Sequence, residues 1–425
     1  MVGWRVHDLR EALHNELHAR PSVVVTAPAQ VRSWAFLIEP DEHEAARQHW
    51  QQLTQMGVGV ERLEESNDRQ AVARLGSVRI KWEHHSEFVS YTLYAEGALD
   101  TAAILGQLPA GWFAAAPGSL IAAVALDIRP ITTTPPDHFL SAIDPFGPTT
   151  VAAKIGDGAG WLITDLQLHD GMTRFTIIDA AIMPRQLGRI VQRLIEIETY
   201  RMLALLAFPA ARQVSASLSV WEKRLAQLMH ELGSAEGIEA ERQLLQSLTQ
   251  LAGEVERSVA DSNFRFGAAA AYYRLVQQRA DDLREQRLTG FSTLKGFLER
   301  RLAPAMNTCA AVHRRQEELS ARISRNSQLL RTRVDLKLQE QNQQLLDEMN
   351  RRARLQLRLQ EAAEQFSVVA ITYYGSQLVQ YLAKAGKEWL PLAPEVVTAL
   401  AIPAIAALAA LGIYRLRRKL HVTLP

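Results

Sequence analysis

Two uncharged apolar runs near the C-terminus constrain this chain more than any other feature. The second run, residues 396–414 (VVTALAIPAIAALAALGIY), has no charged residue and matches the length of about 20 residues that a helix needs to cross a hydrocarbon core. We predict that it is a transmembrane helix. The first run, residues 365–383, is also uncharged but carries Gln, Ser and Thr. It is either a second span or a helix at the end of a soluble stalk.

Polar side chains of the first run share one helical face, because they lie seven, four and four residues apart: Gln365, Thr372, Ser376 and Gln380. Uncharged polar residues are tolerated in a membrane helix when they face a partner or water. We therefore take them as candidate pore-lining residues. Their oxygen atoms would suit Mg²⁺ or another divalent cation, either transported or regulatory, and no other cofactor is expected.

The charges around the two runs favour a hairpin. An Arg-rich stretch, residues 351–358, precedes the first run, and a basic cluster follows the second: Arg415, Arg417, Arg418 and Lys419. The connector between the runs has no net charge. By the positive-inside rule we expect helices over residues 365–385 and 394–414, both termini in the cytoplasm, and the basic cluster at the membrane surface.

Composition excludes several classes of protein. The formal net charge of +1 on 425 residues gives no global field for nucleic acid. Cys309 is the only cysteine, which excludes an intramolecular disulfide framework and a cysteine-based zinc cluster. The N-terminus has no apolar core of a secretory signal, so we expect most of the chain in the cytoplasm.

Residues 1–210 have the pattern of an α+β domain with a mainly antiparallel sheet. A long helix is expected from Pro184 to about Leu206, ended by Pro209. Glycine-containing connections at 156–160 and 169–171 indicate hairpins. The predicted strands are residues 23–26, 31–38, 71–84, 88–95, 120–128, 149–155, 161–168 and 173–179.

Residues 211–364 are typical of a coiled-coil helical stalk. Leu218, Leu225 and Leu232 recur at heptad spacing, and the rhythm resumes at Leu244 after glycines at 233–237. A further helix is predicted over residues 266–285. Residues 305–374 contain neither Pro nor Gly, so one helix on the order of 100 Å long is predicted there. Such a helix must pack on neighbours or on other copies of the chain, and residues 365–425 then form the membrane region.

Histidine pairs are the only candidate metal ligands, and both are weak. His14 and His18 stand one helical turn apart, but Glu16 between them is at the wrong offset for an HExxH site. His84 and His85 are adjacent on a predicted strand and would face opposite sides of it. No catalytic constellation is recognisable, so we do not expect an enzyme.

Four long motifs carry a family resemblance: HNELHARP at 14–21, KWEHHSEFVSYT at 81–92, RLIEIETYRMLALLAFP at 193–209 and LLRTRVDLKLQEQNQQLL at 329–346. They resemble the bacterial membrane-anchored proteins grouped as domain of unknown function 3422. The resemblance covers nearly the whole chain and implies a protein of the bacterial inner membrane, with no activity to carry over.

The layout is also similar to that of CorA-type magnesium channels, which are pentamers. Their Gly-Met-Asn signature after the first span is absent here, where the chain has AKAGKEW at 383–389. From the layout and the polar stripe on the first run we expect a membrane-anchored homo-oligomer of CorA-like organisation that conducts a divalent cation. The alternative is a non-transporting scaffold or sensor that presents the α+β domain to a protein partner.

Overall fold

The computed structural model describes residues 6–16, 22–56, 60–62, 69–97, 99–131, 143–385 and 393–422. The chain divides into two compact units. The first contains residues 1–234 and 246–327, and the second contains residues 235–245 and 328–425. Each is described by itself below.

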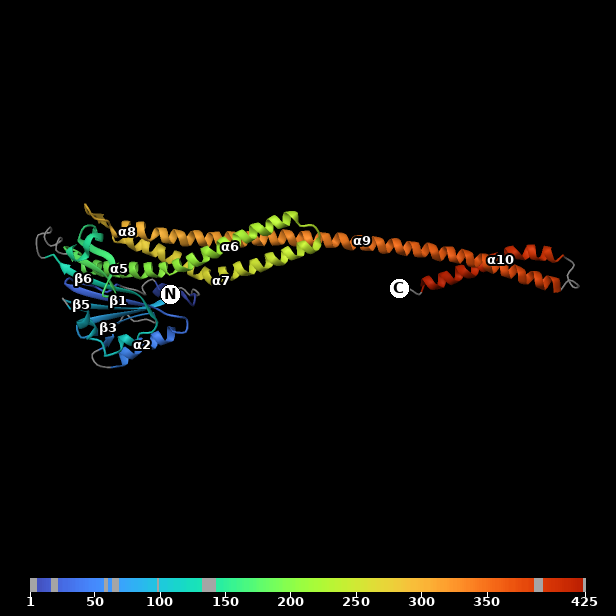
Figure 1. Cartoon of the computed structure of the whole chain (residues 1–425). Helices are drawn as coiled ribbons and strands as arrows, with labels where there is room; N and C mark the ends of the chain where they lie inside the picture. Colours follow the sequence, from blue (N-terminus) through green and yellow to red (C-terminus); the bar gives the residue numbers. More distant parts are fainter. Residues whose placement is uncertain are drawn as a thin grey trace. The chain divides into compact units, whose positions relative to one another are not determined.

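The first unit is built on a sheet of ten strands in the order β10-β7-β8-β9-β6-β1-β5-β4-β3-β2 (Figure 1). The strands predicted from residue 31 onward are confirmed, with 71–84 divided into a hairpin at Gly76. The strands are β1 Ala29–Leu37, β2 Val60–Arg62, β3 Gln70–Leu75, β4 Val78–His84, β5 Phe88–Glu96, β6 Ser119–Pro130, β7 Val151–Ile155, β8 Gly160–His169, β9 Met172–Asp179 and β10 Gln286–Arg287.

The sheet is mixed rather than uniformly antiparallel. All described pairings between strands are antiparallel except that of β6 with β9, and an isolated bridge between Val151 and Ser292 is also parallel. After β6 the chain re-enters the sheet at β7, three places away, and returns through two hairpins so that β9 runs parallel to β6. Hairpin signals predict only sequential neighbours, and for that reason the sequence did not indicate this pairing.

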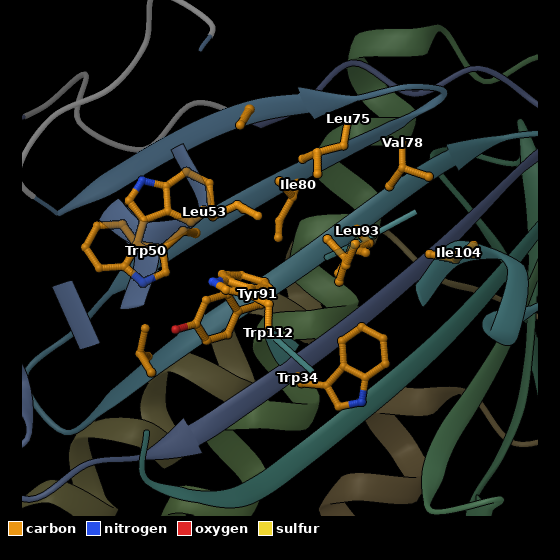
Figure 2. Close-up of a cluster of buried hydrophobic side chains, with 14 of the residues drawn as sticks. Trp34, Trp50, Leu53, Leu75, Val78, Ile80, Tyr91, Leu93, Ile104 and Trp112 are labelled. Carbon is orange, nitrogen blue, oxygen red and sulfur yellow. The ribbon is translucent and has the colours of Figure 1, made fainter. Parts of the chain in front are cut away.

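Helices cover both faces of the sheet (Figure 1). Helices α2 (His43–Gln55) and α3 (Thr101–Leu105) close one face, over a core that includes Trp50, Leu53 and Tyr91 (Figure 2). Helix α5 (Pro184–Leu205) closes the other face and buries Leu187, Val191 and Leu194. Burial of both faces explains why so many strand positions are apolar without strict alternation. The short helix α1 (Arg10–Glu16) lies near the N-terminus.

Long helices complete the first unit. Helix α6 (Ala207–Ser234) and α7 (Ile238–Asp282) meet at the predicted glycine break, and α8 (Leu294–Arg301) precedes α9 (Ala303–Ala385). Within this unit, Arg315 Nε on α9 donates to Glu222 Oε1 on α6 at 2.7 Å. Arg224 Nη1 on α6 lies 3.1 Å from Glu254 Oε1 on α7. The three helices therefore pack on one another through ion pairs as well as buried leucines, which are Leu218, Leu225, Leu248, Leu251 and Leu319.

The second unit contains the later part of α9 and helix α10 (Pro394–Val422). Glu241 is completely buried, and its Oε1 accepts from Arg333 Nε and Lys337 Nζ, each at 2.8 Å. Further along, α10 approaches α9 at Gly375: a Cβ added there would lie 2.9 Å from Ile405 Cγ2. The region from Ala305 to Tyr374 is one uninterrupted helix, as the absence of Pro and Gly predicted.

Three local predictions were wrong. Residues 22–26 are not a strand, because Val25 N donates to Pro184 O at 3.3 Å and the segment packs on α5 instead of joining the sheet. The helix expected over 266–285 is not separate but is part of α7. Pro209 does not end α5, which stops at Leu205; the proline lies in the first turn of α6, where its missing N–H costs nothing.

Gly188 permits the close approach of this segment to α5. A Cβ at Gly188 would lie 2.0 Å from the carbonyl oxygen of Val23, which is backbone and cannot rotate away. We predict that Gly188→Ala lowers the free energy of unfolding by about 1–3 kcal/mol, the usual cost of overpacking.

The matched control is Gly267→Ala on α7, where an added Cβ meets nothing within 4 Å. This exchange should raise stability by about 0.5–1 kcal/mol, because alanine is the better helix former. Thermal unfolding of both variants measures the difference. Equal effects of the two substitutions would contradict the packing described here.

Candidate functional site

A cleft in the first unit is the candidate site. It has a volume of about 1120 Å³ and opens between α2, the ends of β3 and β4, and helices α5 and α7. Its walls combine aromatic rings with basic side chains. The lining residues are His43, Glu44, Arg47, Trp50, Gln51, Arg69, Ala71, Trp82, His84, His85, Ser86, Phe88, Tyr200, Tyr272 and Leu275.

One wall is formed by α2 and β4. His43, Arg47 and Trp50 are four and three residues apart, so they share one face of α2. Trp82 and His84 are two residues apart and therefore lie on the same face of β4, because side chains alternate between the two faces of a strand. The rings of Trp50 and Trp82 stack with centroids 5.8 Å apart, and Trp82 stacks on His84 at 5.7 Å. The cleft therefore rests on a continuous aromatic column that belongs to the core.

Two imidazoles meet at the end of this column. His43 Nδ1 and His84 Nε2 are 2.9 Å apart, so one ring must donate to the other. Burial is the largest cause that lowers the pKa of His84, and together with the positive charges of His43, Arg47 and Arg69 it brings the pKa to about 4. His84 is therefore neutral at pH 7, and the charges that face it make this end of the cleft electropositive.

The opposite wall is tied together by Glu87. Its carboxylate binds Arg265 Nη1 at 2.8 Å and accepts from the hydroxyl of Tyr272 at 3.1 Å. Burial and the neighbouring Glu87 raise the pKa of Tyr272, so its hydroxyl stays protonated. Tyr200 stacks on Tyr272 at 5.6 Å. The acidic charge of Glu87 is thus compensated within the wall.

The histidines predicted as weak metal candidates do not come together. His84 bonds to His43, whereas His85 stacks on Phe88 at 4.1 Å, so the two face different neighbours. His14 lies in α1, and His18 lies outside the described residues. In the part of the chain that the structure describes, no group of three or more His, Cys, Asp or Glu side chains could hold a metal ion.

Sequence reasoning missed His43, Arg47 and Arg69 as site residues. The signal on α2 is present as HxxxRxxW at residues 43–50, a basic and aromatic stripe on one helical face. Nothing in the sequence joins this stripe to His84, because α2 and β4 meet only through the fold.

Two of the four polar residues predicted to line a pore have hydrogen-bond partners within their own helix. The hydroxyl of Thr372 donates to Val368 O at 2.7 Å, and that of Ser376 donates to Tyr373 O at 2.8 Å. Gln380 is half-buried, Gln365 is exposed, and Arg415 at the end of α10 is exposed. Arg417, Arg418 and Lys419 belong to α10 by backbone, and their side chains lie outside what the structure describes.

Two helical segments among the described residues are long and apolar enough to cross a membrane, Pro184–Ser234 and Pro394–Arg415. The first comprises α5 and α6, and 33% of its most apolar part is buried. The second has no buried residue in its most apolar part. The run at 365–383 is not among the segments that meet this criterion.

The lowered pKa of His84 predicts a dependence of stability on pH. The folded-state pKa of about 4 lies below the unfolded value of 6.5, so the unfolded chain binds more protons between these values. The free energy of unfolding should therefore fall as the pH falls from about 6.5 to 4. Burial also lowers the pKa of His49, which acts in the same direction.

The variant His84→Gln keeps a side-chain donor and acceptor but has no titrating ring. Its unfolding midpoint should fall less steeply over the same pH range than that of the parent chain. Thermal unfolding at pH 4.5, 5.5, 6.5 and 7.5 measures both slopes. If the unfolding midpoints of the variant and the parent chain depend equally on pH, His84 is not a source of the pH dependence.

Comparison with known proteins identifies a family over nearly the whole length. A family model described as "Protein of unknown function (DUF3422)" matches residues 5–420. No curated protein matches the chain. The family resemblance predicted from the four motifs is therefore confirmed, whereas the likeness to CorA-type channels gains no support from these comparisons.

Proposed function

The chain belongs to the DUF3422 family, whose description states no activity. We propose from its structure that it is a membrane-anchored protein, which presents its α+β body to a cytoplasmic partner and does not transport an ion. In this proposal the membrane is the bacterial inner membrane, and a C-terminal helical hairpin is the anchor.

The observation that carries the proposal is the exposure of α10. Its segment Pro394–Arg415 is apolar, and no residue of its most apolar part is buried. Leu400, Leu408 and Leu411 are all exposed. A soluble protein rarely leaves an apolar surface of this kind in water, whereas lipid covers it at no cost.

The contact at Gly375 supports a hairpin of two spans. Gly375 lies at the middle of 365–385, and Ile405 lies at the middle of 394–415. Two antiparallel helices that touch at their midpoints lie at the same depth in a bilayer. If α10 crosses the bilayer, the first run crosses with it, even though its polar residues make it less hydrophobic.

The exposed surface of the first run is consistent with lipid. Its large apolar side chains are exposed, while the hydroxyls of Thr372 and Ser376 donate to carbonyls of their own helix. Hydroxyl groups that are satisfied in this way are tolerated in hydrocarbon. The exposed side chains are Phe366, Val369, Ile371, Tyr373, Tyr374, Leu378, Tyr381 and Leu382.

Charged substitutions near the middle of α10 test the anchor. Arginine costs about 2.5–3.5 kcal/mol at the centre of a span. The double variant Ile402→Arg, Leu408→Arg should therefore leave the membrane fraction after cell lysis and ultracentrifugation. The control carries two arginines at exposed apolar positions outside the runs, Leu168→Arg and Val220→Arg, and should sediment with the membrane like the parent chain.

Retention of the α10 variant in an alkaline-washed membrane pellet, at the level of the control, would refute α10 as the anchor. The alkaline wash matters because it removes proteins that are attached only through a peripheral partner.

A cation pore in a homo-oligomer, a pentamer if CorA-like, is the competing proposal. It would need Thr372 and Gln380 to face a central axis. We expect purified protein in liposomes to show no Mg²⁺ flux above that of empty vesicles. A flux that requires the protein and falls in Thr372→Val and Gln380→Leu would establish the pore and contradict our proposal.

A further inference from the structure

We propose that the cleft between α2, β3 and β4 binds a nucleoside phosphate, with the phosphate groups at Arg47 and Arg69 and the base against the aromatic wall. This inference goes beyond the proposed function, because it concerns the first unit alone and does not depend on how the chain is anchored.

The basic end of the cleft supplies donors for phosphate. Arg47 on α2 and Arg69 just before β3 line the cleft, and their charges act on His84, which is bonded to His43. Guanidinium groups recognise phosphate through paired charge-assisted hydrogen bonds. Two arginines and two imidazoles at one end therefore form a recognisable anion-binding surface.

Arg47 can exchange its present partner for a ligand at little cost. Its Nη1 lies 3.0 Å from Glu44 Oε2 in an i,i+3 pair, and both side chains are substantially exposed. Exposed pairs of this kind contribute about 0–1 kcal/mol. A phosphate group with two or more negative oxygen atoms is the stronger partner for Arg47.

The same charges disfavour a metal ion, although two imidazole nitrogens in contact could suggest one. Arg47 and Arg69 lie close enough to lower the pKa of His84, so they would also repel a cation at this position. Within the described residues no third His, Cys, Asp or Glu joins the pair as a ligand. An anion removes the electrostatic conflict that a metal ion would increase.

The size and the walls of the cleft argue for more than a small anion. The volume of about 1120 Å³ is at the upper end of the range for sites that hold cofactor-sized molecules, and a phosphate ion would leave most of it unfilled. His85 and Tyr272 line the cleft with half-buried rings, and each is stacked on a more deeply buried ring, Phe88 and Tyr200 respectively. Any nucleic-acid base can stack on an aromatic ring of this kind, because every base has a planar π-face.

Binding of ADP, adenosine and inorganic phosphate to the detergent-solubilised full chain tests the proposal. Isothermal titration calorimetry gives the affinity. We expect ADP to bind at least about tenfold more tightly than adenosine, because one charge-assisted contact contributes about that factor. It should also bind at least about tenfold more tightly than phosphate, because stacking of the base contributes a similar factor. Affinity should fall as the salt concentration rises.

Arg47→Gln and Arg69→Gln should each weaken ADP binding about tenfold or more, for the same reason. Arg74→Gln is the matched control, since Arg74 is exposed on the same strand β3 but does not line the cleft. All three positions are exposed, so the variants should fold, and circular dichroism with unfolding midpoints checks that they do.

The proposal is overturned if none of the three probes binds, or if ADP binding is the same in Arg47→Gln, Arg69→Gln and Arg74→Gln. If phosphate binds as tightly as ADP and depends in the same way on the two arginines, the base does not contact the aromatic wall, and that part of the proposal is wrong. The membrane anchor is measured independently by sedimentation, so failure of one proposal leaves the other standing.

Discussion

The sheet of the first unit has two apolar faces, and each must be covered for the unit to be stable. On one face α2 and α3 bury Trp50, Leu53 and Ile104, and on the other α5 buries Leu187 and Leu194. Complete burial of a Leu-sized side chain contributes about 1.5–3 kcal/mol, so each helix is held by several such contributions. The positions of the helices, and of every side chain they carry, follow from this requirement.

The candidate cleft is a consequence of how α2 meets the sheet. The apolar residues of this helix enter the core, and Trp50 continues the stack that Trp82 and His84 form on β4. The N-terminal half of the same helical face carries His43 and Arg47, which reach the end of the sheet instead of its centre. One helix therefore serves both the core and the cleft, and the rigid aromatic column fixes the geometry of the basic groups. A site that is supported by packed elements of this kind is preorganised for a ligand.

The second unit presents a different physical problem. Glu241 is buried with two cationic partners, which compensates its charge locally, but α10 leaves its apolar surface uncovered. A helix with no polar face gains nothing from water on any side. A lipid environment removes the cost of exposing this apolar surface to water. Gly375 lets α9 and α10 approach each other closely, so both helices can lie in the same environment. The proposed anchor and the proposed ligand site thus arise from separate requirements in separate parts of the chain.

Much of the local structure was accessible from sequence. Most strands from residue 31 onward, the glycine break between α6 and α7, and the unbroken α9 follow from patterns with periods of two or 3.6 residues and from the positions of Gly and Pro; β2 and β10 were not predicted. The uncharged run in α10 and the family motifs are also properties of the sequence itself. The parallel pairing of β6 with β9, the contact of Val23 with Gly188, and the bond between His43 and His84 could not be predicted in this way. Each joins residues that are far apart in the chain, and such contacts depend on the burial of both sheet faces, which no local pattern records.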